Sequence, residues 1–137
     1  MNGPPVEFRI LREAKSGLDC LRVEIPLEVC TGPTVEVRWL QFILDTGAEV
    51  SMVSEDVAAA LRLPGGGRTV SVTGSTARGV GRIIPVRFRF AAVPDLSIDS
   101  EWMVMPGVTD LRLLALRDVL PHFEIRTLNM SLYFVRK

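Results

Sequence analysis

The segment 45–48, which reads Asp-Thr-Gly-Ala, is the part of this 137-residue sequence best suited to chemistry. It follows an apolar run over 40–44, so the Asp45 carboxylate leaves a buried strand and enters a loop at the edge of the core. At such a position the surroundings of a carboxyl group control its protonation, as acid–base catalysis requires. A glycine after it allows a tight turn whose N–H groups can point at the carboxylate. An ordinary Asx turn is the alternative for these residues alone.

Strands must position this loop, because alternation of apolar and polar residues dominates the sequence. Residues 21–29 alternate, with Pro26 indicating an edge or a bulge. The strand over 35–44 then becomes apolar on both faces before it reaches Asp45. Further strands are predicted over 70–72, 84–90, 100–105, 124–126 and 130–135.

A short helix is predicted after the 45–48 loop. Ser54 is a suitable N-cap, Glu55 and Asp56 suit the first helical turn, and the run 57–61 propagates the helix until the Pro-Gly-Gly-Gly of 64–67 ends it. The sequence therefore predicts a single mainly β domain over 1–137 with one or two short helices.

The Asp-Thr-Gly-Ala after an apolar strand resembles the motif of the retropepsin-like aspartic proteases, which are the retroviral proteases and their single-domain bacterial and eukaryotic relatives. The resemblance extends in order over a core of about residues 21–135. It implies a retropepsin-like acid protease fold, a closed β-barrel with a flap hairpin and one or two short helices, assembled as a homodimer. It also implies an aspartic endopeptidase that acts on a polypeptide substrate and needs no cofactor.

The resemblance assigns a role to each residue of the loop. Asp45 corresponds to the catalytic aspartate and Thr46 to the residue that locks the two catalytic loops of a dimer together. Gly47 corresponds to the residue whose carbonyl binds the substrate backbone, and Ala48 completes the active-site loop.

Supporting residues follow from the same resemblance. Glu49 and Arg117 are expected to form an ion pair near the loop, and Asp118 follows as part of the family's Arg-Asp or Arg-Asn pair. Ordinary surface charges are the alternative for all three. The sequence departs from the family at Leu116, where a glycine is usual; a shift of one position would place Ala115 there instead.

One aspartate does not suffice for hydrolysis by carboxylates, since one group must accept a proton from water while another donates one to the amide. Two adjacent carboxylates titrate as a pair and share one proton. The sequence contains a single Asp-Thr/Ser-Gly, so the second carboxylate must come from a second copy of the chain. The alternative is a catalytically inactive retropepsin-like module for dimerisation or peptide binding, and an unrelated small β domain is a third reading.

The hairpin tip around 73–79 resembles the family's flap, which closes over substrate. Its candidate residues are Gly74, Ser75, Thr76, Ala77 and Gly79. An exposed hairpin without a function is the alternative. The terminal strands over 6–11 and 131–135 are candidates for an intermolecular sheet, although such strands more often pair within their own domain.

Composition excludes several classes of function. With 16 basic and 16 acidic residues the chain has no global positive charge, so nucleic acid is not an expected partner. No apolar run is long enough for a membrane helix, and a cytoplasmic location is expected. Cys20, Cys30 and His122 lack metal-ligand spacing, so no metal site is expected. Six arginines and no acidic residue lie within 57–94, which predicts either a solvated outer face or a preference for anionic partners.

Overall fold

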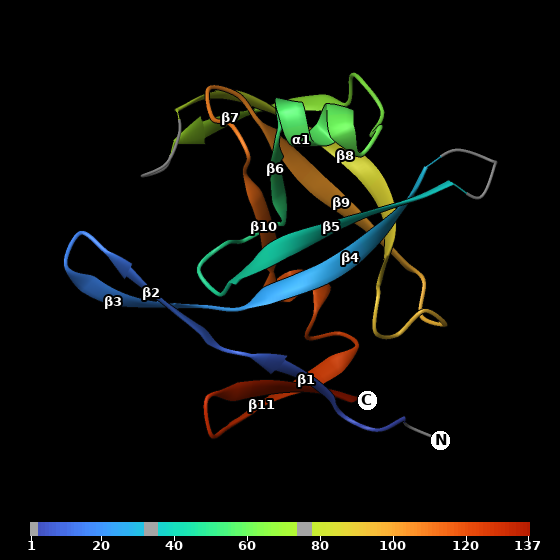
Figure 1. Cartoon of the computed structure of the whole chain (residues 1–137). Coiled ribbons are helices and arrows are strands. Elements are labelled where there is room, and N and C mark those ends of the chain that lie inside the picture. Colours follow the sequence, from blue (N-terminus) through green and yellow to red (C-terminus); the bar gives the residue numbers. More distant parts are fainter. Residues whose placement is uncertain (1–2, 32–35, 74–77) are drawn as a thin grey trace.

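The computed structural model describes residues 3–31, 36–73 and 78–137 (Figure 1). Strands dominate, and the helices are a single α-helix and a 3₁₀ helix within these ranges. The elements are β1 (Val6–Arg9), β2 (Leu11–Lys15), β3 (Leu18–Arg22), β4 (Glu24–Thr31), β5 (Glu36–Asp45), β6 (Met52–Ser54), α1 (Glu55–Ala60), β7 (Arg68–Thr73), β8 (Arg78–Phe90), β9 (Ile98–Met105), β10 (Arg112–Ala115), η1 (Leu116–Asp118), β11 (Phe123–Leu128) and β12 (Ser131–Arg136).

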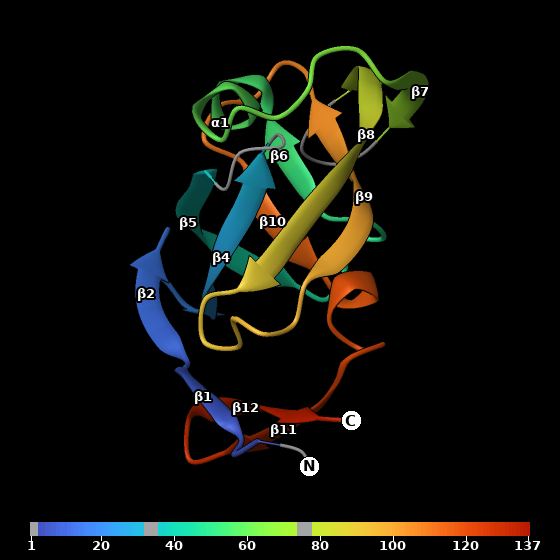
Figure 2. The same cartoon turned by 90° about the vertical axis from the view of Figure 1, so that its right-hand side faces the viewer.

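Six strands close into a barrel. They are hydrogen-bonded in the order β4, β5, β10, β6, β9 and β8, and a further pairing of β4 with β8 closes the ring, with β7 added outside β8. The β5–β10 and β6–β9 pairs are parallel, and the other pairs are antiparallel (Figure 2). The prediction of a mainly β fold with a closed barrel is confirmed.

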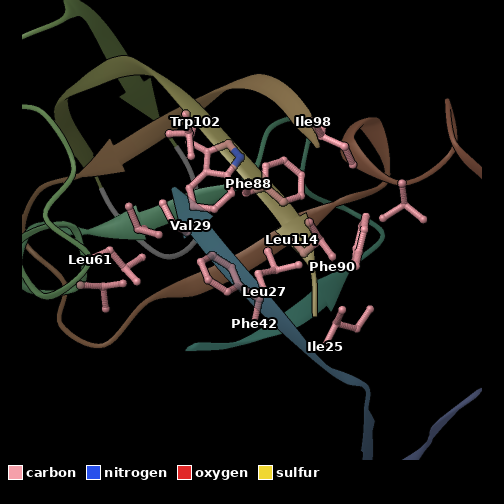
Figure 3. Close-up of a cluster of buried hydrophobic side chains, with 14 of the residues drawn as sticks. Ile25, Leu27, Val29, Phe42, Leu61, Phe88, Phe90, Ile98, Trp102 and Leu114 are labelled. Carbon is pink, nitrogen blue, oxygen red and sulfur yellow. The ribbon is translucent and has the colours of Figure 1, made fainter. Parts of the chain in front are cut away.

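The barrel is filled by large side chains that alternate along its strands (Figure 3). Trp102 lies between Phe42 and Phe88, with ring centroids 5.1 and 5.3 Å away. All three side chains are fully buried. Each such burial contributes about 1.5–3 kcal/mol, so this cluster fixes β5, β8 and β9 relative to one another.

The two ends of the chain form a second, three-stranded sheet in the order β1-β12-β11. Its apolar face packs against the barrel through Phe90, whose ring centroid lies 5.3 Å from that of Phe123 and 5.6 Å from that of Phe134. The terminal strands therefore pair within their own chain, and β12 has a neighbour from this chain on each side.

A hairpin that the periodicity did not indicate lies between β1 and β4. Ser16 and Gly17 both have positive φ, 52° and 76°, which forms a two-residue turn that pairs β2 with β3. The predicted strands over 6–11 and 21–29 are found in large part, but each is interrupted, at Ile10 and at Val23, and the residues between these two points form the hairpin. It extends away from the barrel at the left of Figure 1.

The predicted helix and the predicted irregularity at Pro26 are both found. Helix α1 begins after Ser54 as expected, but the Ser54 hydroxyl accepts a hydrogen bond from the Leu111 N–H at 3.0 Å instead of capping the helix. Pro26 pairs with β5 but lies just outside the β4–β8 ladder, which begins at Leu27.

In the part of the chain that the structure describes, no helix has the length and apolar character needed to span a membrane.

Candidate active site

Asp45 is the last residue of β5 and lies opposite Ala115 of the parallel strand β10. The Gly47 N–H donates a hydrogen bond to Asp45 Oδ1 at 2.9 Å, and the Ala48 N–H donates to the Asp45 backbone carbonyl at 3.2 Å. Asp45 is partly exposed, while Thr46 and Gly47 are exposed. The loop thus orients a carboxylate that solvent can reach, as the sequence predicted.

A buried hydrogen-bond network lies behind this loop. The Ser51 hydroxyl donates to Asp118 Oδ2 at 2.5 Å and accepts from the Ala115 N–H at 2.9 Å. The Ser100 hydroxyl donates to the other carboxylate oxygen, Oδ1, at 2.5 Å. Ser51 and Asp118 are almost fully buried. The network therefore connects η1, β9 and the segment after the 45–48 loop to Ala115, the residue in register with Asp45.

Ser51 and Ser100 are the residues that sequence reasoning missed. Each is a common residue type inside an alternating segment, so neither gives a local signal. The only hint available for Ser51 is that it is a polar residue between apolar neighbours, directly before β6.

The supporting residues have different surroundings. Asp118 is buried, so the surface-charge alternative is wrong for this residue. Glu49 and Arg117 are both exposed, and no ion pair joins them in the described chain. The expected Glu49–Arg117 pair is therefore wrong, because Arg117 belongs to the exposed side of η1 while Asp118, next in sequence, points inward.

Leu116 and Ala115 are the two candidates for the position at which the family usually has glycine. Ala115 is fully buried and is the residue in register with Asp45. Leu116 starts η1 and is only partly buried. The small side chain of Ala115 therefore lies beside the end of β5, and Leu116 is one residue further along the chain.

The predicted flap hairpin is formed by β7 and β8, which pair from Arg68 with Ile83 to Thr73 with Arg78. Its candidate tip residues Gly74, Ser75, Thr76 and Ala77 lie outside the described residues. Gly79 lies in β8 opposite Val72 with φ of 142°.

The arginines of 57–94 are largely neutralised by carboxylates that lie outside this stretch or at its edge. Counting the charges within 57–94 cannot reveal these ion pairs, because each pair joins two different strands or a strand and the helix. Four ion pairs with N–O distances of 2.7 to 3.0 Å are formed: Arg68–Glu101, Arg82–Glu55, Arg87–Asp99 and Arg89–Glu28. The arrangement favours the solvated outer face over an anion-binding surface.

The polar groups of the site are carboxylates, hydroxyls and backbone N–H groups. Among the residues with described positions, no three His, Cys, Asp or Glu side chains form a group able to hold a metal ion.

Comparison with known proteins agrees with this geometry. The family described as "gag-polyprotein putative aspartyl protease" matches residues 33–114, which is more than half of the chain. The chain is also similar to the crystal structure of a retropepsin-like aspartic protease from Rickettsia conorii, with 16% identity and a TM-score of 0.68 over 99% of this chain and 96% of that one. At this identity the likeness concerns the fold. No curated protein matches the sequence. The chain belongs to the family of retropepsin-like aspartyl proteases.

Proposed function

We propose that this protein is an aspartic endopeptidase that acts as a homodimer, with Asp45 of each subunit supplying one of two catalytic carboxylates. Family and fold support aspartic protease function in general terms. The observation that carries the proposal is the accessible Asp45 carboxylate, held by the Gly47 N–H at the end of a buried strand.

In the proposed mechanism the two carboxylates share one proton, as in aspartic proteases generally. The ionised carboxylate accepts a proton from water as the water oxygen attacks the scissile carbonyl carbon. The protonated carboxyl donates its proton to the substrate, and the tetrahedral intermediate then collapses to release an amine and a carboxylic acid. Activity is therefore expected to fall both when the pair is fully protonated and when it is fully ionised.

The other parts of the site would position the two chains and the substrate. Exposed Thr46 is proposed to bond across the two-fold axis to the partner loop. The Gly47 carbonyl and the β7–β8 hairpin, including Gly79, are proposed to bind an extended peptide through its backbone. Glu49 and Arg117 are exposed beside the loop and carry no assigned role in the chemistry.

Replacement of Asp45 by Asn is the direct test. The variant keeps the size and shape of the side chain but removes the ionisable group, so peptide hydrolysis should fall by at least 10³-fold while the unfolding transition is retained. Asp99→Asn is the matched control, since Asp99 is an exposed carboxylate of β9 that pairs with Arg87. Cleavage that survives in Asp45→Asn would rule out the mechanism.

A peptide-binding or dimerisation module without turnover is the second candidate, favoured by Leu116, which follows the residue in register with Asp45. Assays of binding and of cleavage with one peptide library separate the two candidates. Binding without cleavage across the pH range would support the module, and cleavage that depends on Asp45 would exclude it.

A further inference from the structure

The loop that begins at Asp45 is fastened at both of its ends to one residue, Ala115. At the first end, Asp45 lies in register with Ala115 on the parallel strand β10. At the other end, the Ser51 hydroxyl accepts a hydrogen bond from the Ala115 N–H at 2.9 Å. Between these two points the chain leaves the barrel, since residues 46–47 are exposed. The position of the Asp45 carboxylate therefore depends on how firmly Ala115 and Ser51 are held.

Strand β10 supplies a firm base for the loop. Ala115 is fully buried, and Leu114, the residue before it, belongs to the same buried cluster inside the barrel as Phe42 (Figure 3). Side chains in such a core are closely packed and occupy defined positions. The hydrogen bond from the Ala115 N–H to Ser51 therefore ties the far end of the loop to the barrel core.

Asp118 sets the direction in which the Ser51 hydroxyl forms hydrogen bonds. Its carboxylate accepts at both oxygens, from Ser51 at Oδ2 and from Ser100 at Oδ1, each at 2.5 Å. A serine hydroxyl has one proton and two lone pairs. Because Ser51 donates its proton to Asp118, its lone pairs remain available to the Ala115 N–H.

The backbone of Ser51 is held as well. The Met103 N–H of β9 donates to the Ser51 carbonyl at 2.9 Å. Ser51 is therefore bound to β9 through its carbonyl, to β10 through its hydroxyl oxygen and to η1 through its hydroxyl proton. Its side chain is fully buried, so water does not compete for these bonds.

We propose that Ser51 and Asp118 are positioning residues for peptide hydrolysis: they hold the Asp45 loop where its carboxylate meets the second carboxylate. This inference rests on the proposed function and adds to it two buried residues that act through the loop. A displacement of about 1 Å at a reacting group can cost on the order of 100-fold in rate, so the loss should fall on kcat. KM should change less, because the β7–β8 hairpin, which is proposed to bind the peptide, lies outside the loop.

The test compares Ser51→Ala with Ser54→Ala. Both serines are fully buried, and each accepts a hydrogen bond from a backbone N–H near one end of β10. The donor to Ser54 is the Leu111 N–H at 3.0 Å, which lies four residues before Ala115, or roughly 13 Å along an extended strand. The two variants therefore lose the same kind of buried bond at different distances from Asp45.

The steady-state constants are measured at a temperature where unfolding curves show both variants to be folded. In Ser51→Ala, kcat should fall by about tenfold or more while KM stays within about threefold of the wild type. In Ser54→Ala both constants should stay within about threefold. A merely structural role predicts the same small effect on kcat in both folded variants.

Asp118 supplies the conservative comparison from the other side of the network. The oxygen of Asp118→Asn can accept from Ser51 while its amide donates to the Ser100 oxygen, so this variant should retain most of the kcat that Asp118→Ala loses.

Hydrogen exchange adds a measurement that needs no activity. The amides of Gly47 and Ala48 are hydrogen-bonded to Asp45 within the loop. Both should exchange faster in Ser51→Ala than in the wild type, and at the wild-type rate in Ser54→Ala.

Equal kcat values in the two serine variants, or unchanged exchange at Gly47 and Ala48 in a folded Ser51→Ala, overturns the inference and leaves the proposed function standing. If Ser51→Ala does not fold, equal kcat values in Asp118→Asn and Asp118→Ala overturn it in the same way. A wild type that hydrolyses no peptide instead contradicts the proposed function, and this inference with it.

Discussion

Ser51 connects β10, the strand that pairs with β5 beside Asp45, to the buried carboxylate of Asp118, so its removal has a large expected cost. Ser51→Ala leaves the buried Ala115 N–H and Asp118 Oδ2 without their partner. The free energy of unfolding should fall by roughly 2–4 kcal/mol in denaturant titrations. Ser71→Ala is the control, because Ser71 is exposed on β7 and its loss should cost less than about 0.5 kcal/mol. An equal effect of both substitutions would contradict the role of the network.

Asp118 provides a graded test at the same site. Asp118→Asn keeps the side-chain shape and an acceptor oxygen, and its amide can donate to the remaining serine oxygen, so the loss should be about 1 kcal/mol. Asp118→Ala removes both acceptors from Ser51 and Ser100 and leaves a cavity, so the loss should be roughly 3 kcal/mol or more. The unfolding temperature of Asp118→Asn should therefore be higher than that of Asp118→Ala. The reverse order would show that the hydrogen bonds contribute little to stability.

At the scale of elements, Arg82 of β8 joins helix α1 to the turn that follows it. Its guanidinium donates to both carboxylate oxygens of Glu55 at 3.0 and 3.1 Å and to the carbonyls of Pro64 and Gly66 at 2.8 and 3.1 Å. Arg82→Lys retains the charge but cannot make this fork, so about 1 kcal/mol of stability should be lost, a small value because Glu55 is largely exposed. Faster hydrogen exchange confined to 55–67 would confirm the assignment, and unchanged exchange there would contradict it.

The same pair predicts a dependence of stability on pH. The hydrogen bonds from Arg82 lower the pKa of Glu55 below its ordinary value. The folded state therefore releases this proton more readily than the unfolded state, and the stabilisation present above the ordinary pKa of Glu is lost as pH falls through the lowered value. Glu55→Gln should give a shallower decline of unfolding free energy on the acid side. An unchanged slope would show that this carboxylate does not contribute.

At the scale of the whole molecule, half of the proposed active site belongs to each subunit. Specific activity should therefore rise with protein concentration until the dimer is saturated. Equal amounts of wild type and Asp45→Asn, allowed to exchange subunits, should retain about a quarter of the activity of an all-wild-type dimer population, since random pairing of two subunits gives that share of intact dyads. Retention of about half would instead show that each chain acts alone.

Local sequence signals were sufficient for much of the fold. The apolar run before Asp45 predicted a buried strand ending at the loop, and β5 ends at that residue. The Ser54 N-cap and the acidic first turn predicted α1, and the Asp-Thr-Gly-Ala motif indicated the family. These features depend on residues close together in sequence, where periodicity, capping and motif spacing are visible.

Tertiary structure decided what depends on residues far apart in sequence. Ser51 and Asp118 are 67 positions apart and meet only because β6, β9 and β10 pair as they do. The burial of Asp118 beside an exposed Arg117 and the pairing of the arginines with distant carboxylates arise in the same way. The sequence by itself determined the Asp-Thr-Gly-Ala motif and the strand that leads into it. Barrel closure determined the support of the motif and the exposure of the β2–β3 hairpin, because hydrogen bonds and burial between distant segments exist only once the sheet is formed.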